Sequence, residues 1–456
     1  MRHWKTILSL ALPSILSFAA MTASGTINLI LVGQMGALVI AIVGVSNIVM
    51  YNAWALFSGL GHTVNYLVAQ SFGAERMDQG VRRAYVALLV AATMGAAVFF
   101  FGLFASGAIL KLMGGDAAFV GEGTVYLQLR FAAMACSIPI FVFHGFLRGI
   151  GDTRTPLLLT IVGNGVMVLL TYGLAFGRLG LPELGLAGAG WGMVAGEAVG
   201  LIGCLYVYYI RMHERYGTRR RVRPTLAETK LIAAESGKLG LQEFAMSASM
   251  LVFTRFVMEL GTTAVAANEV ALNVMSFGFM PAFAFGATAT ILVGQEIGRG
   301  APELARKLGT HTALLGSVFL LALGAVEFVF AESIARWYTD DPEVYRLTAH
   351  LIQVAAFLQL FDGFYNFYGG GLRGIGDTAF LLKSSLVLNG FLFLPVAYVS
   401  VFVFEWGSYG AWISLYVYMT AFGLALMARY YRTDWSQVRL KEEGPPLPPE
   451  NEVASR

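Results

Sequence analysis

Twelve long apolar segments divide this chain, and they restrict its fold more than any other feature of the sequence. They lie near residues 7–31, 38–60, 84–112, 122–147, 155–177, 187–210, 233–258, 263–293, 308–332, 345–371, 379–404 and 407–428. A helix of about 20 apolar residues crosses a bilayer core, where only helices and closed barrels satisfy every backbone polar group. Hydrophobic residues make up 57% of the chain and charged residues only 13%. The sequence therefore predicts an all-α integral membrane protein with twelve transmembrane helices.

The N-terminal segment, the cysteines and the basic residues do not indicate another class of protein. The first apolar segment is too long for the core of a cleaved signal, although Ala23, Ser24 and Gly25 resemble a cleavage site, so we interpret it as a retained helix. Cys136 and Cys204 both lie inside predicted spans, which indicates packing residues instead of a disulfide framework or a metal cluster. Basic residues flank the spans, so we expect no nucleic-acid partner.

The loops between the spans alternate in their content of lysine and arginine. If the N-terminus is cytoplasmic, only Lys111, Arg178, Arg336 and Arg346 lie outside. The inner loops then hold Arg2, Lys5, Arg76, Arg82, Arg83, Arg148, Arg154, Arg211, Arg215, Arg219, Arg220, Arg221, Arg223, Lys230, Arg299, Arg306, Lys307, Arg373 and Lys383. Because cytoplasmic loops are enriched in these residues, the pattern predicts a multi-pass plasma-membrane protein with both termini in the cytoplasm.

The chain also repeats itself. The stretch LRGIGDT occurs at Leu147 to Thr153 and again, 225 positions later, at Leu372 to Thr378. The same offset relates Gly36 to Gly261, Gly61 to Gly286, Thr63 to Thr288, Gln70 to Gln295 and Gly73 to Gly298. Each copy holds six spans, an even number, so the copies are parallel and related by an axis along the membrane normal. We expect six-helix lobes at 1–212 and 233–430, a basic cytoplasmic linker at 213–232 and a flexible tail at 431–456.

The repeated stretch is interpreted as a structural corner at the cytoplasmic end of the fourth and tenth spans. Arg148 and Arg373 are expected to reach lipid headgroups there, and the glycines permit a sharp reversal of the chain. Asp152 or Thr153 is expected to cap the next helix, and Pro156 fits a first helical turn. Because the glycines do not follow a strand, we expect no phosphate-binding loop.

Two fused, similar bundles with a seam between them favour a transporter, in which one half rocks against the other around a midplane site. A channel or a membrane enzyme can share this architecture. A channel would be expected to repeat a filter or a ring of charges, and neither is visible. An enzyme needs a convergent catalytic set, and the histidines show no metal-like spacing on one helix face.

Acidic side chains inside the spans are the candidate coupling groups, because an ionisable group at mid-bilayer is costly and usually functional. Asp362 and Glu243 lie deepest by sequence count, and no basic residue of the second half is expected at that depth. Either can carry a proton, and together they can bind a sodium ion. Glu197 is the only deep acid of the first half, and Glu269 has an assisting role.

Two further acids are given structural roles. Arg255 and Glu259 are spaced for a salt bridge at the outer rim, near Glu269. Glu327 is expected to snorkel or to face a neighbouring helix. Neutral polar residues supply candidates for the lining of a central cleft, although hydrogen bonds between helices are the alternative for each: Asn28, Tyr51, Asn52, Asn65, Asn164, Asn273, Tyr365 and Asn366.

Several motifs together resemble those of the multidrug and toxic compound extrusion (MATE) family. The motifs are ALPSI at Ala11 to Ile15, LVGQMG at Leu31 to Gly36, LVAQSFGA at Leu67 to Ala74, LRGIGDT, LPELGLAGAGWG at Leu181 to Gly192, AANEVALN at Ala266 to Asn273 and LVGQEIGRG at Leu292 to Gly300. The resemblance covers about residues 5 to 430. It implies twelve helices in two lobes, a V-shaped cleft, and export of cationic or amphipathic compounds driven by protons or sodium ions.

Carried over position by position, the resemblance implies a bend of the first helix at Pro13 and an aspartate of the tenth helix at Asp362. The acid that many members carry on the first helix falls on Asn28, and the acid that some carry on the fifth helix falls on Val168. The glutamate that sodium-coupled members carry on the seventh helix falls on Met250. Glu243, about two turns earlier, is then a substitute.

These observations lead to one hypothesis and one alternative. The hypothesis is a monomeric, cation-coupled antiporter for cationic or amphipathic small molecules, without a cofactor, in contact with membrane lipids. The alternative is a flippase or exporter of a lipid-linked or amphipathic metabolite. A flippase would be expected to place cationic residues in the cleft, and the spans offer only Arg130 and Arg255.

Overall fold

The computed structural model describes residues 2–219, 223–338 and 340–441, and within them the chain is helical without a strand. The first half comprises α1 (Arg2–Gly33), α2 (Ala37–Gly73), α3 (Met77–Leu112), α4 (Ala117–Gly149), α5 (Arg154–Phe176) and α6 (Leu186–Tyr206), which continues as the π-helix η1 (Val207–Arg211). The short α7 (His213–Tyr216) follows. Residues 220–222 of the predicted basic linker lie outside the described residues.

The second half begins earlier than its apolar segment suggests, at the start of α8. It comprises α8 (Leu226–Met258), α9 (Thr262–Gly298), α10 (Pro302–Val329), α11 (Ala331–Tyr338), α12 (Pro342–Gly374), α13 (Thr378–Val387), η2 (Leu388–Phe393), α14 (Leu394–Tyr398), η3 (Val399–Val403), α15 (Gly407–Arg432) and the 3-10 turn η4 (Trp435–Gln437). Residues 378–403 form one continuous candidate span. The last third of the predicted linker is therefore part of α8.

Eleven helices of the described chain are long and apolar enough to cross a membrane. The twelfth long helix is α8, which falls short because polar and charged residues are spread along it, with Glu228, Glu235 and Lys238 in its first half. These side chains have partners: Arg82 lies 2.6 Å from Glu228, and Lys238 lies 2.8 Å from Glu235. The expected all-α fold of twelve long helices in two lobes is confirmed.

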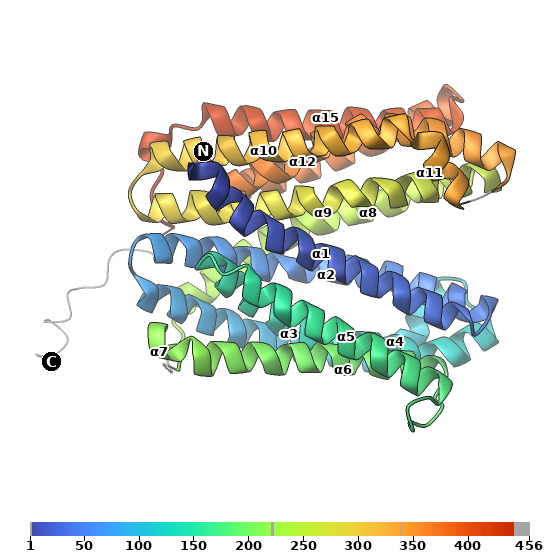
Figure 1. The fold of residues 1–456 in the computed structure, drawn as a ribbon, viewed down its shortest axis with the longest axis horizontal. Helices are drawn as coiled ribbons and strands as arrows, with labels where there is room; N and C mark the ends of the chain where they lie inside the picture. Colours follow the sequence, from blue (N-terminus) through green and yellow to red (C-terminus); the bar gives the residue numbers. More distant parts are fainter. Residues whose placement is uncertain (1, 220–222, 339, 442–456) are drawn as a thin grey trace, which may run out of the picture.

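The internal repeat is visible in the helix bounds. Moving α2 by 225 positions gives α9 at both ends, and moving α4 by the same offset gives α12 at both ends. Gly36 and Gly261, which precede α2 and α9, share positive φ values of 117° and 100°. The helices of the two halves run in the same directions (Figure 1). The two halves are therefore parallel copies, and Figure 1 shows them as two layers with a seam between them.

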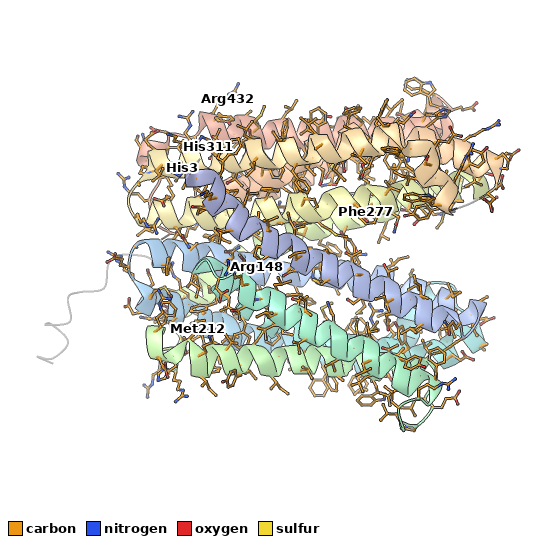
Figure 2. All side chains as sticks on the ribbon, in the orientation of Figure 1. His3, Arg148, Met212, Phe277, His311 and Arg432 are labelled. Carbon is orange, nitrogen blue, oxygen red and sulfur yellow. The ribbon has the colours of Figure 1, made fainter. Side chains whose placement is uncertain are left out.

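Two helices cross the seam. α1 begins on the second half, where the rings of His3 and His311 lie 5.9 Å apart, and runs diagonally onto the first half (Figures 1 and 2). Its equivalent α8 packs closely against α2, since a Cβ on Gly240 would lie 2.1 Å from the Leu56 carbonyl oxygen. The first helix of each half therefore also packs against the other half.

The halves are joined at the end of the bundle that carries the turns 74–76, 150–153, 299–301 and 375–377, called here the terminus end because the N-terminus lies there (Figure 1). Glu235 of α8 accepts hydrogen bonds at Oε2 from Tyr66 Oη of the first half (2.7 Å) and from Thr378 Oγ1 of the second half (2.6 Å). A buried carboxylate with several donors is well satisfied. This contact closes the seam at the terminus end.

The repeated LRGIGDT stretch forms the expected corner. Gly151 and Gly376 adopt φ values of 86° and 80°, which glycine tolerates without strain. Asp152 Oδ1 accepts hydrogen bonds from the backbone N–H groups of Arg154 and Thr155, so the predicted cap of α5 is confirmed. The equivalent Asp377 instead forms an ion pair with Arg429 at 2.8 Å.

The predicted flexible tail, 431–456, differs from the structure in its first part. α15 continues to Arg432, and Trp435 is buried, with its Nε1 donating to the Tyr430 carbonyl oxygen at 3.0 Å. The chain is then described as far as Lys441, while residues 442–456 lie outside the described residues. Both cysteines are free, and Pro13 lies inside α1.

Candidate functional site

Asp362 lies on α12 and is almost completely buried, with 1% of its surface exposed. One turn further along the helix, Asn366 donates from Nδ2 to the Asp362 carbonyl oxygen at 3.0 Å and to its Oδ2 at 3.2 Å. Within the described residues no basic side chain forms an ion pair with Asp362. The carboxyl group is therefore held in place by a neutral partner, which leaves its charge uncompensated.

Glu243 lies on α8 and close enough to Asp362 for the two carboxyl groups to interact electrostatically. Tyr365 donates from its hydroxyl to Glu243 Oε1 at 3.2 Å and accepts from Gln242 Nε2 at 3.0 Å. The structure thus brings three predicted residues, Asp362, Glu243 and Tyr365, into one cluster between α8 and α12.

The cluster contains a base that the sequence interpretation excluded. Arg373 Nη2 lies 3.9 Å from Glu243 Oε1, and its Nη1 lies 3.4 Å from His62 Nδ1. Only 9% of Arg373 is exposed, so the expectation that it reaches lipid headgroups is wrong. The guanidinium turns inward because the end of α12 lies at the seam, where a carboxylate is available as a partner. Glu243 is therefore partly neutralised, and Asp362 is not.

Glu197 of α6 lies in a different place, on the wall of a cavity of about 530 Å³ in the first half. This cavity, called here the large cavity, is lined by α1, α2, α4, α5 and α6, and it contains three of the predicted lining residues, Asn28, Tyr51 and Asn164. Arg130 also lines it and donates to Asn47 Oδ1 at 2.8 Å. Glu197 is therefore part of a polar wall and not of the Asp362 cluster.

Three predicted site residues lie outside both the Asp362 cluster and the wall of the large cavity. Glu269 and Asn273 lie on exposed positions of α9, and Asn273 Oδ1 accepts a hydrogen bond from Tyr338 at 3.0 Å. Asn52 accepts from Ser247 Oγ at 2.8 Å, which joins α2 to α8, and it lines a second, largely apolar cavity of about 520 Å³. The structure does not bring Glu269, Asn273 or Asn52 to Asp362.

Glu259 and Glu327, the acids that were predicted to have structural roles, form contacts with neighbouring side chains. Arg255 and Glu259 form the predicted ion pair at 2.7 Å, without Glu269. Glu327 faces a neighbouring helix and accepts from Gln359 Nε2 at 2.8 Å. In the described chain no group of three or more His, Cys, Asp or Glu side chains is arranged to hold a metal ion.

A smaller cavity of about 90 Å³ lies on the axis that relates the two halves, and we call it the axis cavity. Its walls contain five pairs of residues separated by 225 positions: Ser58 and Phe283, Gly61 and Gly286, His62 and Ala287, Phe141 and Asn366, and Arg148 and Arg373. A cavity lined by equivalent positions of both copies straddles their symmetry axis. Since alternating-access sites form at the interface of such repeats, this position is expected on the transport path.

The three cavities adjoin one another through shared wall residues. Met21 and Trp54 line the large cavity, the axis cavity and a third cavity of about 130 Å³, and Arg148 lines the last two. In Figure 2 the labelled Arg148 lies at the level of the seam between the two halves. The expectation that Arg148 reaches lipid headgroups is therefore also wrong. His62, His144 and the two arginines are site residues that the sequence interpretation missed, and the 225-residue offset of the arginines was the available signal.

Comparison with known proteins identifies the relatives of this chain. The family model MatE matches residues 13–173 and 239–399, one match in each half. A probable multidrug resistance protein NorM of Bradyrhizobium diazoefficiens is 28% identical over 440 residues, covering 93% of this chain and 92% of that protein. The multidrug resistance protein PmpM of Pseudomonas aeruginosa is 26% identical over 451 residues, covering 96% and 93%.

Solved structures share the fold. A MOP superfamily transporter from Pyrococcus furiosus superimposes with a TM-score of 0.86 at 20% identity, over 94% of this chain and 95% of that one. A MATE family multidrug resistance transporter in an outward-facing conformation gives the same values. Since the family model covers most of both halves, and the helices arrange as in these transporters, the chain belongs to the MatE family.

Proposed function

We propose that this chain is a cation-coupled antiporter that exports cationic or amphipathic small molecules. Family membership makes it a multi-pass membrane transporter and not an enzyme. The observation that carries the coupling proposal is Asp362, a buried acid without a basic partner among the described residues, which Asn366 links to a cavity on the symmetry axis. The relatives named as multidrug resistance proteins support the proposed class of cargo.

The coupling ion is proposed to bind at Asp362 as a proton. An isolated charge buried in protein is costly, and a carboxylate removes that cost by taking up a proton. A sodium ion would need several oxygen ligands, such as both carboxylates of the cluster. Glu243 is less suited to that role because Arg373 already lies 3.9 Å from it. Sodium at Asp362 and Glu243 is the second possibility, and it requires Arg373 to move away.

Export by this mechanism requires the terminus end to open and close. In the structure the two halves meet there through Glu235, Tyr66 and Thr378. The large cavity is lined by parts of the helices that lie away from the terminus end. We propose that the terminus end faces the cytoplasm of a cell with this protein in its plasma membrane, since the basic loops lie at that end. We also propose that it works as a monomer, because one chain supplies both sides of the axis cavity.

A second candidate, a flippase or exporter of a lipid-linked or amphipathic metabolite, is favoured by one observation. Such cargo needs cationic groups along the path, and Arg148 and Arg373 both line the axis cavity. The sequence interpretation placed neither of them there. Competition between phosphatidylglycerol and a carboxylate ligand for the axis cavity separates this candidate from the first.

The decisive experiment measures export in proteoliposomes under separately imposed proton and sodium gradients. With ethidium as the probe, we expect a proton gradient alone to drive accumulation on one side of the membrane. Accumulation driven only by a sodium gradient would show that sodium, and not the proton, is the coupling ion. The absence of driven accumulation under either gradient, with a reconstituted and folded protein, would contradict cation-coupled antiport of cationic compounds.

A further inference from the structure

The arginines of the two LRGIGDT copies, Arg148 and Arg373, both line the cavity on the symmetry axis. Arg148 ends α4 and Arg373 ends α12, at equivalent positions of the repeat. Both line the axis cavity together with His62 and His144. Two guanidinium groups and two imidazole rings therefore surround one small cavity of about 90 Å³.

The two arginines differ in their partners. Arg373 has Glu243 at 3.9 Å, a long and partial ion pair, and its Nε has no hydrogen-bond partner in the described structure. Arg148 has neither a hydrogen bond nor an ion pair with another described residue, and its guanidinium carbon lies 5.5 Å from the centroid of the Phe18 ring. One guanidinium charge in the seam is therefore left without an anion.

Neutral donors and apolar surfaces complete the walls of the cavity. Asn65 and Asn366 supply amide groups, and His144 Nε2 is a buried polar atom without a partner in the described chain. The remaining walls include aromatic and sulfur-containing side chains: Phe18, Met21, Trp54, Phe141 and Phe283. A site that combines cationic donors with apolar surface matches a ligand that has an anionic group and an apolar body.

We propose that the axis cavity binds the carboxylate of a small amphipathic ligand, with Arg148 as its principal partner. The planar guanidinium offers paired donors that match a carboxylate in two parallel hydrogen bonds. Arg373 then provides a second positive charge from the other half of the molecule. The inference rests on the proposed transport function and extends it to cargo that carries a negative group, including zwitterions whose cationic part faces Glu197 or Asp362.

The position of the cavity gives this site a role in transport. Because each half contributes one arginine, a carboxylate at the axis contacts both halves and experiences any change in their relative orientation. Trp54 and Met21 connect the axis cavity to the large cavity, so a ligand can extend from one into the other. The carboxylate site is therefore the deep end of a longer binding surface.

The test compares two ligands that share one apolar body, 1-pyrenebutyrate and its neutral amide, 1-pyrenebutyramide. The full-length protein is placed in phosphatidylcholine nanodiscs, and binding is followed by energy transfer from tryptophan to pyrene. We expect the acid to bind at least about tenfold more tightly than the amide, the size of one charge-assisted hydrogen bond. Arg148→Gln should remove this preference and leave amide binding unchanged. Arg255→Gln, which removes an exposed arginine of the rim, is the matched control and should keep it.

Three outcomes would overturn the proposal: equal affinity of the wild type for acid and amide, an acid preference that survives Arg148→Gln, or a loss in Arg148→Gln that is equal for both ligands. Displacement of 1-pyrenebutyrate by phosphatidylglycerol in the nanodisc or by inorganic phosphate would assign the arginines to a headgroup or a free ion instead. Proton-driven ethidium export, measured on the same preparation, separates the two proposals. Export without acid preference rejects the carboxylate site alone, and acid preference without export supports it while rejecting the antiport proposal.

Discussion

Gln70 and Gln295 form the same hydrogen bond in opposite directions across the seam. Gln70 Nε2 donates to the carbonyl oxygen of Gly374, and Gln295 Nε2 donates to that of Gly149, both at 2.9 Å. Each glutamine thus leaves its own half and binds the LRGIGDT corner of the other. The four residues are two pairs related by 225 positions, so the symmetry of the repeat produces a reciprocal clasp at the terminus end.

Removing the clasp should favour opening of the terminus end. Each hydrogen bond contributes about 1 kcal/mol to the closed state, so Gln70→Ala and Gln295→Ala should each raise the open population about fivefold. Spin labels at Asp78 and Glu303, exposed and equivalent positions of α3 and α10, would report the distance across this end in a variant without Cys136 and Cys204. Equal distance distributions in the wild type and both variants would contradict a role for the clasp.

Substitution of the glycines beside the clasp should also favour opening of the terminus end. A Cβ on Gly73 would lie 1.9 Å from the Gln295 carbonyl oxygen, and one on Gly298 would lie 2.2 Å from the Gln70 carbonyl oxygen. Gly73→Ala and Gly298→Ala should therefore separate α2 from α9, open the terminus end in the same distance measurement and reduce export at least about tenfold. Gly44→Ala, on α2 with no neighbouring atom within 4 Å of the added Cβ, should leave both properties unchanged.

Much of the fold follows from the sequence because apolar length and an exact offset are local properties. The repeated LRGIGDT motif predicts that the fourth helix of each half ends alike, and α4 and α12 do end at Gly149 and Gly374. The predicted cap at Asp152 is also local, since its partners lie within three residues. Helix number, parallel halves and corners were therefore predictable.

The candidate site was less predictable because it depends on which face of a helix end meets the seam. Arg373 and Glu243 lie far apart in the chain, and only the packing of α12 against α8 brings them together. Sequence position placed Arg148 at a membrane surface, where it would contact headgroups, but the closed seam makes this surface an interior. The sequence shows how deep a residue lies along a transmembrane helix. It does not show which way the side chain points around the helix axis when every face of the helix is apolar.

Neutralising the proposed coupling acid should abolish driven export without unfolding the protein. Asp362→Asn keeps the size of the side chain and its contact with Asn366, but it cannot exchange a proton. We expect export driven by an ion gradient to fall at least tenfold, to about the level of empty liposomes, while the melting temperature stays near that of the wild type. Glu269→Gln, at an exposed position, should retain export. Full export by Asp362→Asn would reject the assignment.

The last described residue, Lys441, lies between the two halves. Its backbone N–H donates to Gln70 Oε1 at 3.0 Å, and its carbonyl oxygen accepts from Arg83 Nη2 at 2.6 Å, both in the first half. Its ammonium group donates to the Gly376 carbonyl oxygen at 3.3 Å and lies 3.4 Å from Glu235, both in the second half. The tail thus binds the same glutamine that forms one side of the clasp.

Shortening the tail should therefore favour opening of the terminus end only when the deletion includes Lys441. Deleting 439–456 removes every contact of Lys441 but keeps the buried Trp435, so the end of α15 stays packed. Because it leaves Gln70 Oε1 without its donor and removes a cation from Glu235, this deletion should raise the open population at least as much as Gln70→Ala. Deleting only 442–456 keeps Lys441 and should leave the distance between labels at Asp78 and Glu303 as in the full-length chain. If both deletions behave alike, Lys441 does not stabilise the closed end, and its four contacts contribute nothing measurable to the conformational equilibrium.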